Sequence, residues 1–113
     1  MNAPNASRMT LAAVTRGTLD RPLRVVLYGV EGIGKSTFGA DAPAPIFLGA
    51  EDGTGHLDVA RFPQPRTWAD AMDALRVLNA EQHDFKTLVV DTVDWLEPLC
   101  WRAVCDAARK PDI

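Results

Sequence analysis

Apolar residues in this chain gather in three short runs that are separated by turn-forming residues. The runs are LRVVLY (residues 23–28), PIFLGA (45–50) and TLVVD (87–91). Each run is short and rich in branched or bulky apolar residues, and Pro, Gly or Asp bounds it, which is typical of a buried strand. We therefore predict three strands, with the turn EDGTG (51–55) after the second and a carboxylate, Asp91, closing the third.

A helical period follows the second strand. Thr67 is suited to cap a helix, and Asp70 then falls in the first turn. A carboxylate there interacts favourably with the positive end of the helix dipole. Apolar residues recur at helical spacing and are predicted to pack against the rest of the fold. These residues are Trp68, Met72, Leu75 and Leu78.

Two further helices are predicted. The stretch KSTFGADAP after residue 34 can form only a short helix, because Gly39 weakens it and Pro43 stops it. The stretch DWLEPLCWRAVCDAARK predicts a helix from about Asp94, in which Pro98 is tolerated only in the first turn. Its inward-facing residues are expected to be Trp95, Leu99 and Cys100.

The order of these elements predicts an α/β layer structure with a parallel sheet, because strands alternate with helices. Residues 1–20 show no sustained period and are interpreted as a flexible N-terminal leader. Residues 21–113 form the predicted domain. No internal repeat or low-complexity tract is present.

Composition and charge narrow the function classes. The chain has 113 residues, 47% of them apolar and 24% charged, with a net charge of −3 and a pI of about 5.2. That balance gives no argument for nucleic-acid or membrane binding by the chain as a whole. Cys100 and Cys105 form no metal-ligand spacing with His56 or His83, so idle thiols in a reducing cytoplasm are the better interpretation. No segment has the length of a membrane span or the pattern of a signal peptide, and cytoplasmic location follows as the default.

The most specific signal is GVEGIGKS, which directly follows the first apolar run. Gly29, Gly34, Lys35 and Ser36 satisfy the pattern G-x-x-x-x-G-K-[ST], between a predicted strand and a predicted helix. Converging backbone N–H groups of such a loop replace the hydration of a triphosphate, and glycines allow the tight path. The lysine contacts the β- and γ-phosphates, with a catalytic as well as a binding role, and the serine hydroxyl binds Mg²⁺. The predicted ATP-contacting residues are Gly29, Val30, Glu31, Gly32, Ile33, Gly34, Lys35, Ser36 and Thr37.

Two acidic residues complete the predicted site. Asp91 ends a strand and is the expected second magnesium residue after Ser36, usually acting through a water. Glu51 follows the 45–50 strand at the same carboxyl edge, where open α/β sheets bind ligands, and could orient the water that attacks the γ-phosphate. Asp52 is a rival for that catalytic role.

With these segments in place, the chain resembles the RecA-like branch of P-loop ATPases, and is most similar to phage and prophage AAA-type ATP-binding proteins of single-strand annealing and recombination. The resemblance rests on VVLYGVEGIGKSTF, PIFLGAEDG, TWADAMDALRVL and TLVVDTVDWL, within residues 23–96. It implies a three-layer α/β/α core, an ATPase using ATP and Mg²⁺, coupling to single-stranded DNA, and a homo-oligomer. Thr92 lies where the family often has a hydroxyl, whereas Gly49 replaces an acidic residue that is frequent there.

The resemblance also implies an incomplete core. RecA-like cores are longer, so we expect the DNA-contacting loops and any cation acting in trans to lie beyond Ile113. A later strand of that architecture normally lies between the phosphate-loop strand and the metal-aspartate strand. Without it we expect a gap or a non-native pairing in the sheet, weak nucleotide binding and little turnover.

Two other function classes stay open at this point. One is a P-loop kinase that phosphorylates a small metabolite, although Arg61, Arg66 and Arg102 are placed like ordinary surface residues rather than lid residues. The other is a non-hydrolysing assembly module, in which nucleotide binding alone orders a partner interface. ATP is preferred over GTP on family likeness, because no Asn-Lys-x-Asp motif for guanine is present.

Overall fold

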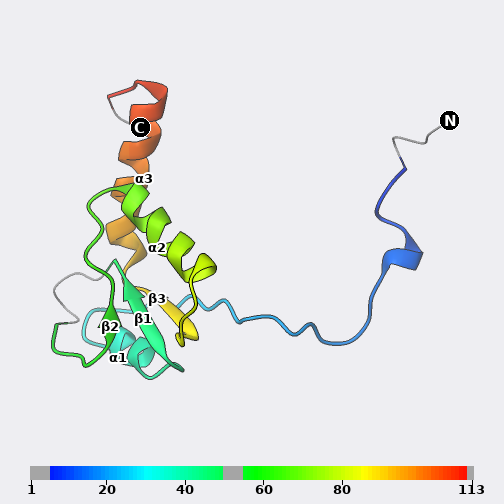
Figure 1. The fold of residues 1–113 in the computed structure, drawn as a ribbon, viewed down its shortest axis with the longest axis horizontal. Coiled ribbons are helices and arrows are strands. Elements are labelled where there is room, and N and C mark those ends of the chain that lie inside the picture. The colour runs from blue at the N-terminus through cyan, green and yellow to red at the C-terminus, as the bar shows by residue number, and fades with distance from the viewer. Residues whose placement is uncertain (1–5, 50–54, 112–113) are drawn as a thin grey trace.

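The computed structural model describes residues 6–49 and 55–111, which form a small parallel sheet with helices around it (Figure 1). The sheet has the order β2-β1-β3, and both pairings are parallel. In chain order the elements are η1 (Leu11–Ala13), α1 (Lys35–Ala40), β1 (Pro45–Leu48), β2 (Ala60–Arg61), α2 (Trp68–Ala80), β3 (Thr87–Val90) and α3 (Val93–Ala108). The α/β class and the parallel sheet agree with the sequence prediction.

The central strand β1 forms the core of the sheet. Ile46, Phe47 and Leu48 are all buried, and Phe47 has no exposed surface. In register, Ile46 lies beside Leu88, Phe47 beside Val89 and Leu48 beside Val90. A strand covered on both faces needs apolar residues throughout, which is why PIFL lacks polar alternation. Among the described residues, the core outside the strand includes the buried side chains of Ala71, Ala74, Leu96 and Cys105.

Helices α1 and α2 lie on opposite faces of this sheet. A Cβ atom added to Gly39 of α1 would lie 2.8 Å from Val89 Cγ1 and 3.5 Å from Phe47 Cζ, so α1 packs on the face that carries those two side chains. Leu48 points to the other face, because side chains alternate along a strand, and there it shares a hollow with Ala74 and Val77 of α2. The arrangement is therefore layered, with the sheet between helices.

Strand β3 is anchored at both ends to the segments beside β1. Thr87 Oγ1 donates to Pro43 O at 2.7 Å, and the Lys86 amide donates to Ala44 O at 3.0 Å. At the other end the Asp91 amide donates to Leu48 O at 3.0 Å. These bonds fix the register and so determine where Asp91 leaves the sheet.

The prediction of a strand at residues 23–28 is wrong for this structure. The segment is extended but lies outside the sheet, and it runs away from the α/β part in Figure 1. Its apolar side chains are exposed, and the radius of gyration, 19.1 Å, exceeds the value of about 13 Å expected for a compact chain of this length. A strand is stable only beside another strand, and residues 23–28 have none beside them among the described residues.

Crossover handedness explains where this segment would belong. The connection from β2 to β3 passes over one face through α2, whereas the connection from residues 23–28 to β1 passes over the other face through α1. Right-handed crossovers on opposite faces run in opposite directions across a sheet. The place for residues 23–28 is therefore on the β3 side, where β3 forms the edge among the described residues.

The helix predictions hold with corrections. Helix α1 is short, as expected, and Thr67 caps α2 by accepting a hydrogen bond from the Asp70 amide at 3.1 Å. The predicted inward stripe of α2 is wrong at Leu75, which is exposed, because the small residues Ala71 and Ala74 make the closest approach.

Helix α3 begins at Val93, and its predicted inward face is wrong at Trp95, which is 52% exposed. Leu96 is buried instead, and it lies on the same helix face as Leu99 and Cys100, three and four positions later, which are half-buried as predicted.

Pro98 falls in the second turn rather than the first, where it leaves the carbonyl of Asp94 without its helical donor. The start of the helix is exposed, so water can donate a hydrogen bond to that carbonyl.

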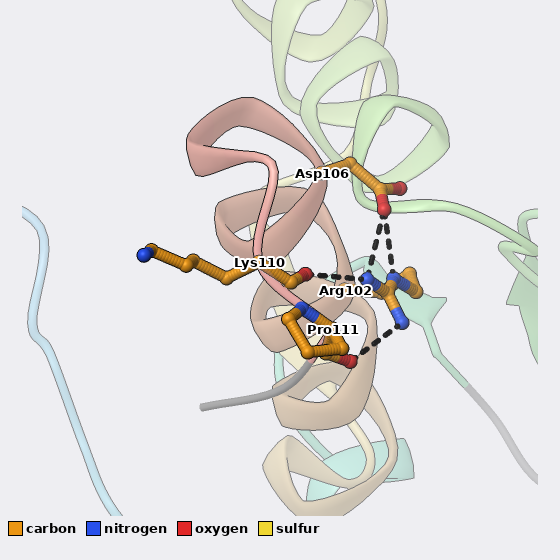
Figure 2. A network of polar contacts seen from close by, with 4 residues as sticks. All are labelled: Arg102, Asp106, Lys110 and Pro111. Atoms are coloured by element: carbon orange, nitrogen blue, oxygen red, sulfur yellow. Dashed lines mark hydrogen bonds and ion pairs between the residues drawn. The ribbon is translucent and has the colours of Figure 1, made fainter.

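The end of α3 is closed by a local polar network (Figure 2). Arg109 adopts a left-handed conformation with φ of 57°, and the Lys110 amide returns to Cys105 O at 2.8 Å. Arg102 donates to Asp106 Oδ1 from Nε at 3.0 Å, and its terminal nitrogens reach Lys110 O at 3.4 Å and Pro111 O at 3.5 Å. Arg102 therefore has a structural role at a helix end, consistent with its interpretation as a surface residue.

Strand β2 was not predicted, because Ala60 and Arg61 form no apolar run and are both exposed. Their pairing comes from β1, which accepts a hydrogen bond at Phe47 O from the Phe62 amide at 2.9 Å.

No helix within residues 6–49 and 55–111 is long and apolar enough to cross a membrane.

Candidate nucleotide-binding site

The glycine loop forms a tight turn that leads directly into α1. Gly32 and Gly34 have φ values of 81° and 99°, a region that residues with a Cβ rarely adopt, and the Ile33 amide closes a turn onto Val30 O at 3.4 Å. Gly34 is the N-cap of α1, and its carbonyl accepts from the Phe38 amide at 2.9 Å. The glycines are therefore needed by the backbone path itself.

Lys35 folds back over this loop. Its Nζ donates to Gly29 O at 2.7 Å and to Val30 O at 2.8 Å. A lysine held at the mouth of a glycine loop is placed to meet the outer phosphates of a nucleotide, whose oxygens would replace these two carbonyls as acceptors. The ammonium group stays within reach of the loop because the loop curves around it.

The amide donors of the site lie at the start of α1. The first N–H groups of any helix have no intrahelical acceptor, and here they belong to Lys35, Ser36 and Thr37. These amides and the turn that precedes them carry partial positive charge, which favours an anion bound at this end of the helix. Of the other predicted contact residues, Val30, Glu31 and Ile33 have exposed side chains, so only their backbone is suited to phosphate binding.

Ser36 and Asp91 meet although 55 positions separate them. Ser36 Oγ donates to Asp91 Oδ2 at 2.5 Å in a partly buried position. Two elements produce this contact: α1 brings the serine over the sheet, and β3 ends at Val90, so the aspartate projects at the carboxyl edge. The packing of Gly39 on Val89 sets the height of α1 above β3.

The donor set at this contact suits magnesium. A hydroxyl and a carboxylate are the hard oxygen ligands that Mg²⁺ takes in proteins, with water and phosphate oxygens filling the remaining positions. Ser36 and Asp91 would hold the ion beside the loop, where it would neutralise phosphate charge. Within the described ranges, this site included, His, Cys, Asp and Glu side chains form no group of three that could hold a metal ion.

Some predicted site residues cannot be compared with the structure. Glu51 and its rival Asp52 lie outside the described residues. The segment that leads to them is described as far as Gly49, which has φ of 81° and whose added Cβ would lie 3.3 Å from Leu96. Glycine at position 49, in place of an acidic residue, thus fits both the backbone and the neighbouring helix.

Sequence reasoning missed the role of Gly39. Its position was interpreted only as a weak point of a short helix, whereas the structure uses the missing side chain for close approach to the sheet. The available signal was a glycine three positions after Ser36, on the same side of the helix as the serine that must reach Asp91.

One known protein family matches most of this chain. The family described as AAA domain matches residues 21–113. The chain belongs to the AAA domain family. Comparisons with curated proteins and with solved structures give no significant match.

Membership of this family indicates a nucleotide-binding, ATPase-type function, and members typically use Mg²⁺ with the nucleotide. The small parallel sheet with helices on its faces is compatible with a P-loop α/β fold. The loop from Gly29 to Ser36 and the residue Asp91 both fall inside the matched range.

Proposed function

We propose that this AAA domain binds Mg²⁺-ATP at the glycine loop and belongs to a RecA-like ATPase that acts with single-stranded DNA in recombination or annealing. The observation that supports the nucleotide site best is the Ser36 Oγ to Asp91 Oδ2 contact at 2.5 Å. It joins two separately predicted magnesium residues beside the loop on which Lys35 is held. A glycine turn without a binding function does not require a carboxylate from a distant part of the chain beside its serine.

In this proposal each residue has a defined task. Backbone amides from Gly29 to Thr37 surround the phosphates, and the Lys35 ammonium balances the charge that develops on the γ-phosphate. Ser36 and Asp91 hold Mg²⁺, and Glu51 orients the attacking water. The DNA coupling and the homo-oligomer rest on the sequence resemblance, which assigns the DNA contacts to segments after Ile113.

Nucleotide titration tests the binding site. Calorimetric titration of the 113-residue chain with Mg²⁺-ATP should give weak, saturable binding, and Lys35→Ala should reduce the affinity at least tenfold because it removes a direct charge contact. Lys86→Ala is the matched control, since this exposed lysine lies on the amino side of β3, and its affinity should equal that of the parent chain. Equal affinity in the parent and Lys35→Ala would overturn the nucleotide site.

The magnesium assignment has its own test. Asp91→Asn should weaken binding of Mg²⁺-ATP while leaving binding of ATP in EDTA unchanged, because the aspartate acts only through the metal. An equal loss in both titrations would mean that Asp91 supports the fold of the loop instead.

Glu51→Gln separates hydrolysis from binding. In a hydrolysing protein this change should abolish phosphate release while nucleotide affinity is retained. Little turnover is expected from the 113-residue chain, with or without an oligo(dT) strand. Hydrolysis that oligo(dT) stimulates in this chain would contradict the assignment of DNA contacts to later segments.

A further inference from the structure

The first glycine of the loop is required by packing and not by its backbone conformation. Gly32 and Gly34 lie in the left-handed region, with φ of 81° and 99°, whereas Gly29 does not. A Cβ atom added to Gly29 would instead lie 3.2 Å from Ile33 Cγ2 and 3.7 Å from Ile33 Cδ1. Carbon atoms in good contact are about 3.5–4.0 Å apart. Position 29 therefore needs glycine because the Ile33 side chain occupies the space that a Cβ would take.

Ile33 is held in this place by the turn that it closes. Its amide donates to Val30 O at 3.4 Å, and its side chain, 65% exposed, belongs to the loop rather than to the core. The Cγ2 atom is bonded directly to Cβ of a branched residue, whose rotation about χ1 is restricted. The contact with Gly29 therefore fixes the start of the loop relative to its middle.

Lys35 depends on the same part of the loop. Its Nζ donates to Gly29 O at 2.7 Å and to Val30 O at 2.8 Å. Ile33 contacts both of these residues, through its side chain at Gly29 and through its amide at Val30. A lysine side chain loses much rotamer freedom when it is held in one conformation, so the position of its two acceptors decides whether it stays ordered.

We propose that Ile33 is a positioning residue for Lys35. It holds Gly29 and Val30 so that their carbonyls receive the ammonium group before a nucleotide is bound. A nucleotide then meets a lysine that is already ordered, which lowers the entropy cost of binding. The effect on nucleotide affinity rests on the proposed function, whereas the ordering of Lys35 does not.

The other groups of the site have anchors that do not include Ile33. Ser36 is held by its hydrogen bond to Asp91, and α1 rests on the sheet through Gly39. Loss of the Ile33 side chain should therefore leave the amides at the start of α1 and the magnesium residues in place. Its effect on binding should pass through Lys35.

The first test needs no nucleotide. NMR relaxation of the ε-methylene of Lys35 in the 113-residue chain measures how ordered the side chain is. Ile33→Ala should lower its order parameter toward that of the exposed Lys86, and Ile33→Val should preserve it, because valine keeps the Cγ2 atom. Val30→Ala is the matched control: it removes another exposed apolar side chain of the loop and leaves the Val30 carbonyl, so Lys35 should stay ordered.

Titration with Mg²⁺-ATP tests the consequence for binding. Ile33→Ala should weaken the affinity by about fivefold, because the lysine must then be ordered during binding. Ile33→Val and Val30→Ala should stay within about twofold of the parent chain, a difference that marks no coupling. In a Lys35→Ala chain, Ile33→Ala should have no further effect, because the group that it positions has been removed.

A second-site substitution tests the close contact itself. Gly29→Ala should disorder Lys35 and weaken the affinity by about as much as Ile33→Ala, because the new Cβ displaces the isoleucine. Adding Gly29→Ala to Ile33→Ala should cost nothing more, since the space is then free. Circular dichroism of each variant checks that the fold is intact.

Three results would overturn the proposal: an unchanged order parameter of Lys35 in Ile33→Ala, an equal loss of affinity from Ile33→Ala with and without Lys35, or additive effects of Gly29→Ala and Ile33→Ala. The nucleotide site fails in a different way. If Ile33→Ala disorders Lys35 although the parent chain does not bind Mg²⁺-ATP, the positioning role stands and the proposed function is wrong.

Discussion

Two apolar segments of this chain look alike in sequence and end in opposite environments. LRVVLY at residues 23–28 is the more β-prone of the two, yet it lies exposed outside the sheet. Strand β1, with the sequence PIFL, begins with a proline but is buried between two other strands. The difference lies in neighbours: β1 has β2 and β3 beside it, and residues 23–28 have no strand beside them within the part of the chain that the structure describes.

This contrast separates the fit of a segment to a buried sheet from the availability of a strand with which it can pair. Apolar, branched residues describe how well a segment would fit a buried sheet, but pairing depends on a free strand edge within reach of the segment. The segment 45–48 meets such edges through short connections. Residues 23–28 have no strand beside them among the described residues, so their high propensity produces no paired strand.

The largest expected effect comes from truncating a side chain in each segment. Phe47→Ala should lower the free energy of unfolding by about 3–5 kcal/mol, because it empties the centre of the core. Val26→Ala should change it by less than about 0.5 kcal/mol, because its side chain is 88% exposed. Urea unfolding followed by circular dichroism measures both.

A comparable loss from the two substitutions would break the comparison, since it would mean that residues 23–28 are packed in solution.

Much of the fold was predictable from local pattern. The strands at 45–48 and 87–90, the Thr67 cap and the short helix before Pro43 depend on near neighbours in sequence, and each was predicted. Strand β2 and the exposure of residues 23–28 depend on what lies beside them in space. The inward residues of α2 and α3 were only partly predicted, because Ala71, Ala74 and Leu96 are selected by the closeness of packing rather than by size.

The candidate site also combines features that were predictable from local sequence with one that was not. The loop from Gly29 to Ser36 has a sequence signature because each residue type serves a separate physical need. The position of Asp91 followed from the rule that parallel strands place their carboxyl ends at one edge. The requirement for Gly39 could not be read from its neighbours, since it depends on Val89, fifty positions later in the chain.

The next largest effect concerns that glycine. Helix propensity alone predicts that Gly39→Ala stabilises the chain by about 0.5–1 kcal/mol. The structure predicts the opposite sign, a loss of about 1–2 kcal/mol, because the added Cβ would lie 2.8 Å from Val89 Cγ1.

A double-mutant cycle with Val89→Ala isolates this contact. Removing Cγ1 should recover most of the loss caused by Gly39→Ala, so the two substitutions should couple favourably by more than about 0.5 kcal/mol. Additive effects in urea unfolding would show that α1 does not rest on β3 as described, and would remove the support for the height of Ser36 above Asp91.

The smallest effect compares two threonines that each precede a helix, Thr67 in residues 29–111 and Thr10 in residues 6–28. Thr67 Oγ1 accepts from the Asp70 amide at 3.1 Å, and Asp70 Oδ2 accepts from the Arg66 amide at 2.9 Å, so Thr67→Ala should cost about 1 kcal/mol. Thr10 precedes the single turn η1 and makes no side-chain cap bond, so Thr10→Ala should leave the unfolding midpoint unchanged. Both substitutions remove the same atoms, and urea midpoints measured side by side compare them directly. Equal losses would mean that residues 6–28 fold together with residues 29–111, and the contrast between the two regions would then be wrong.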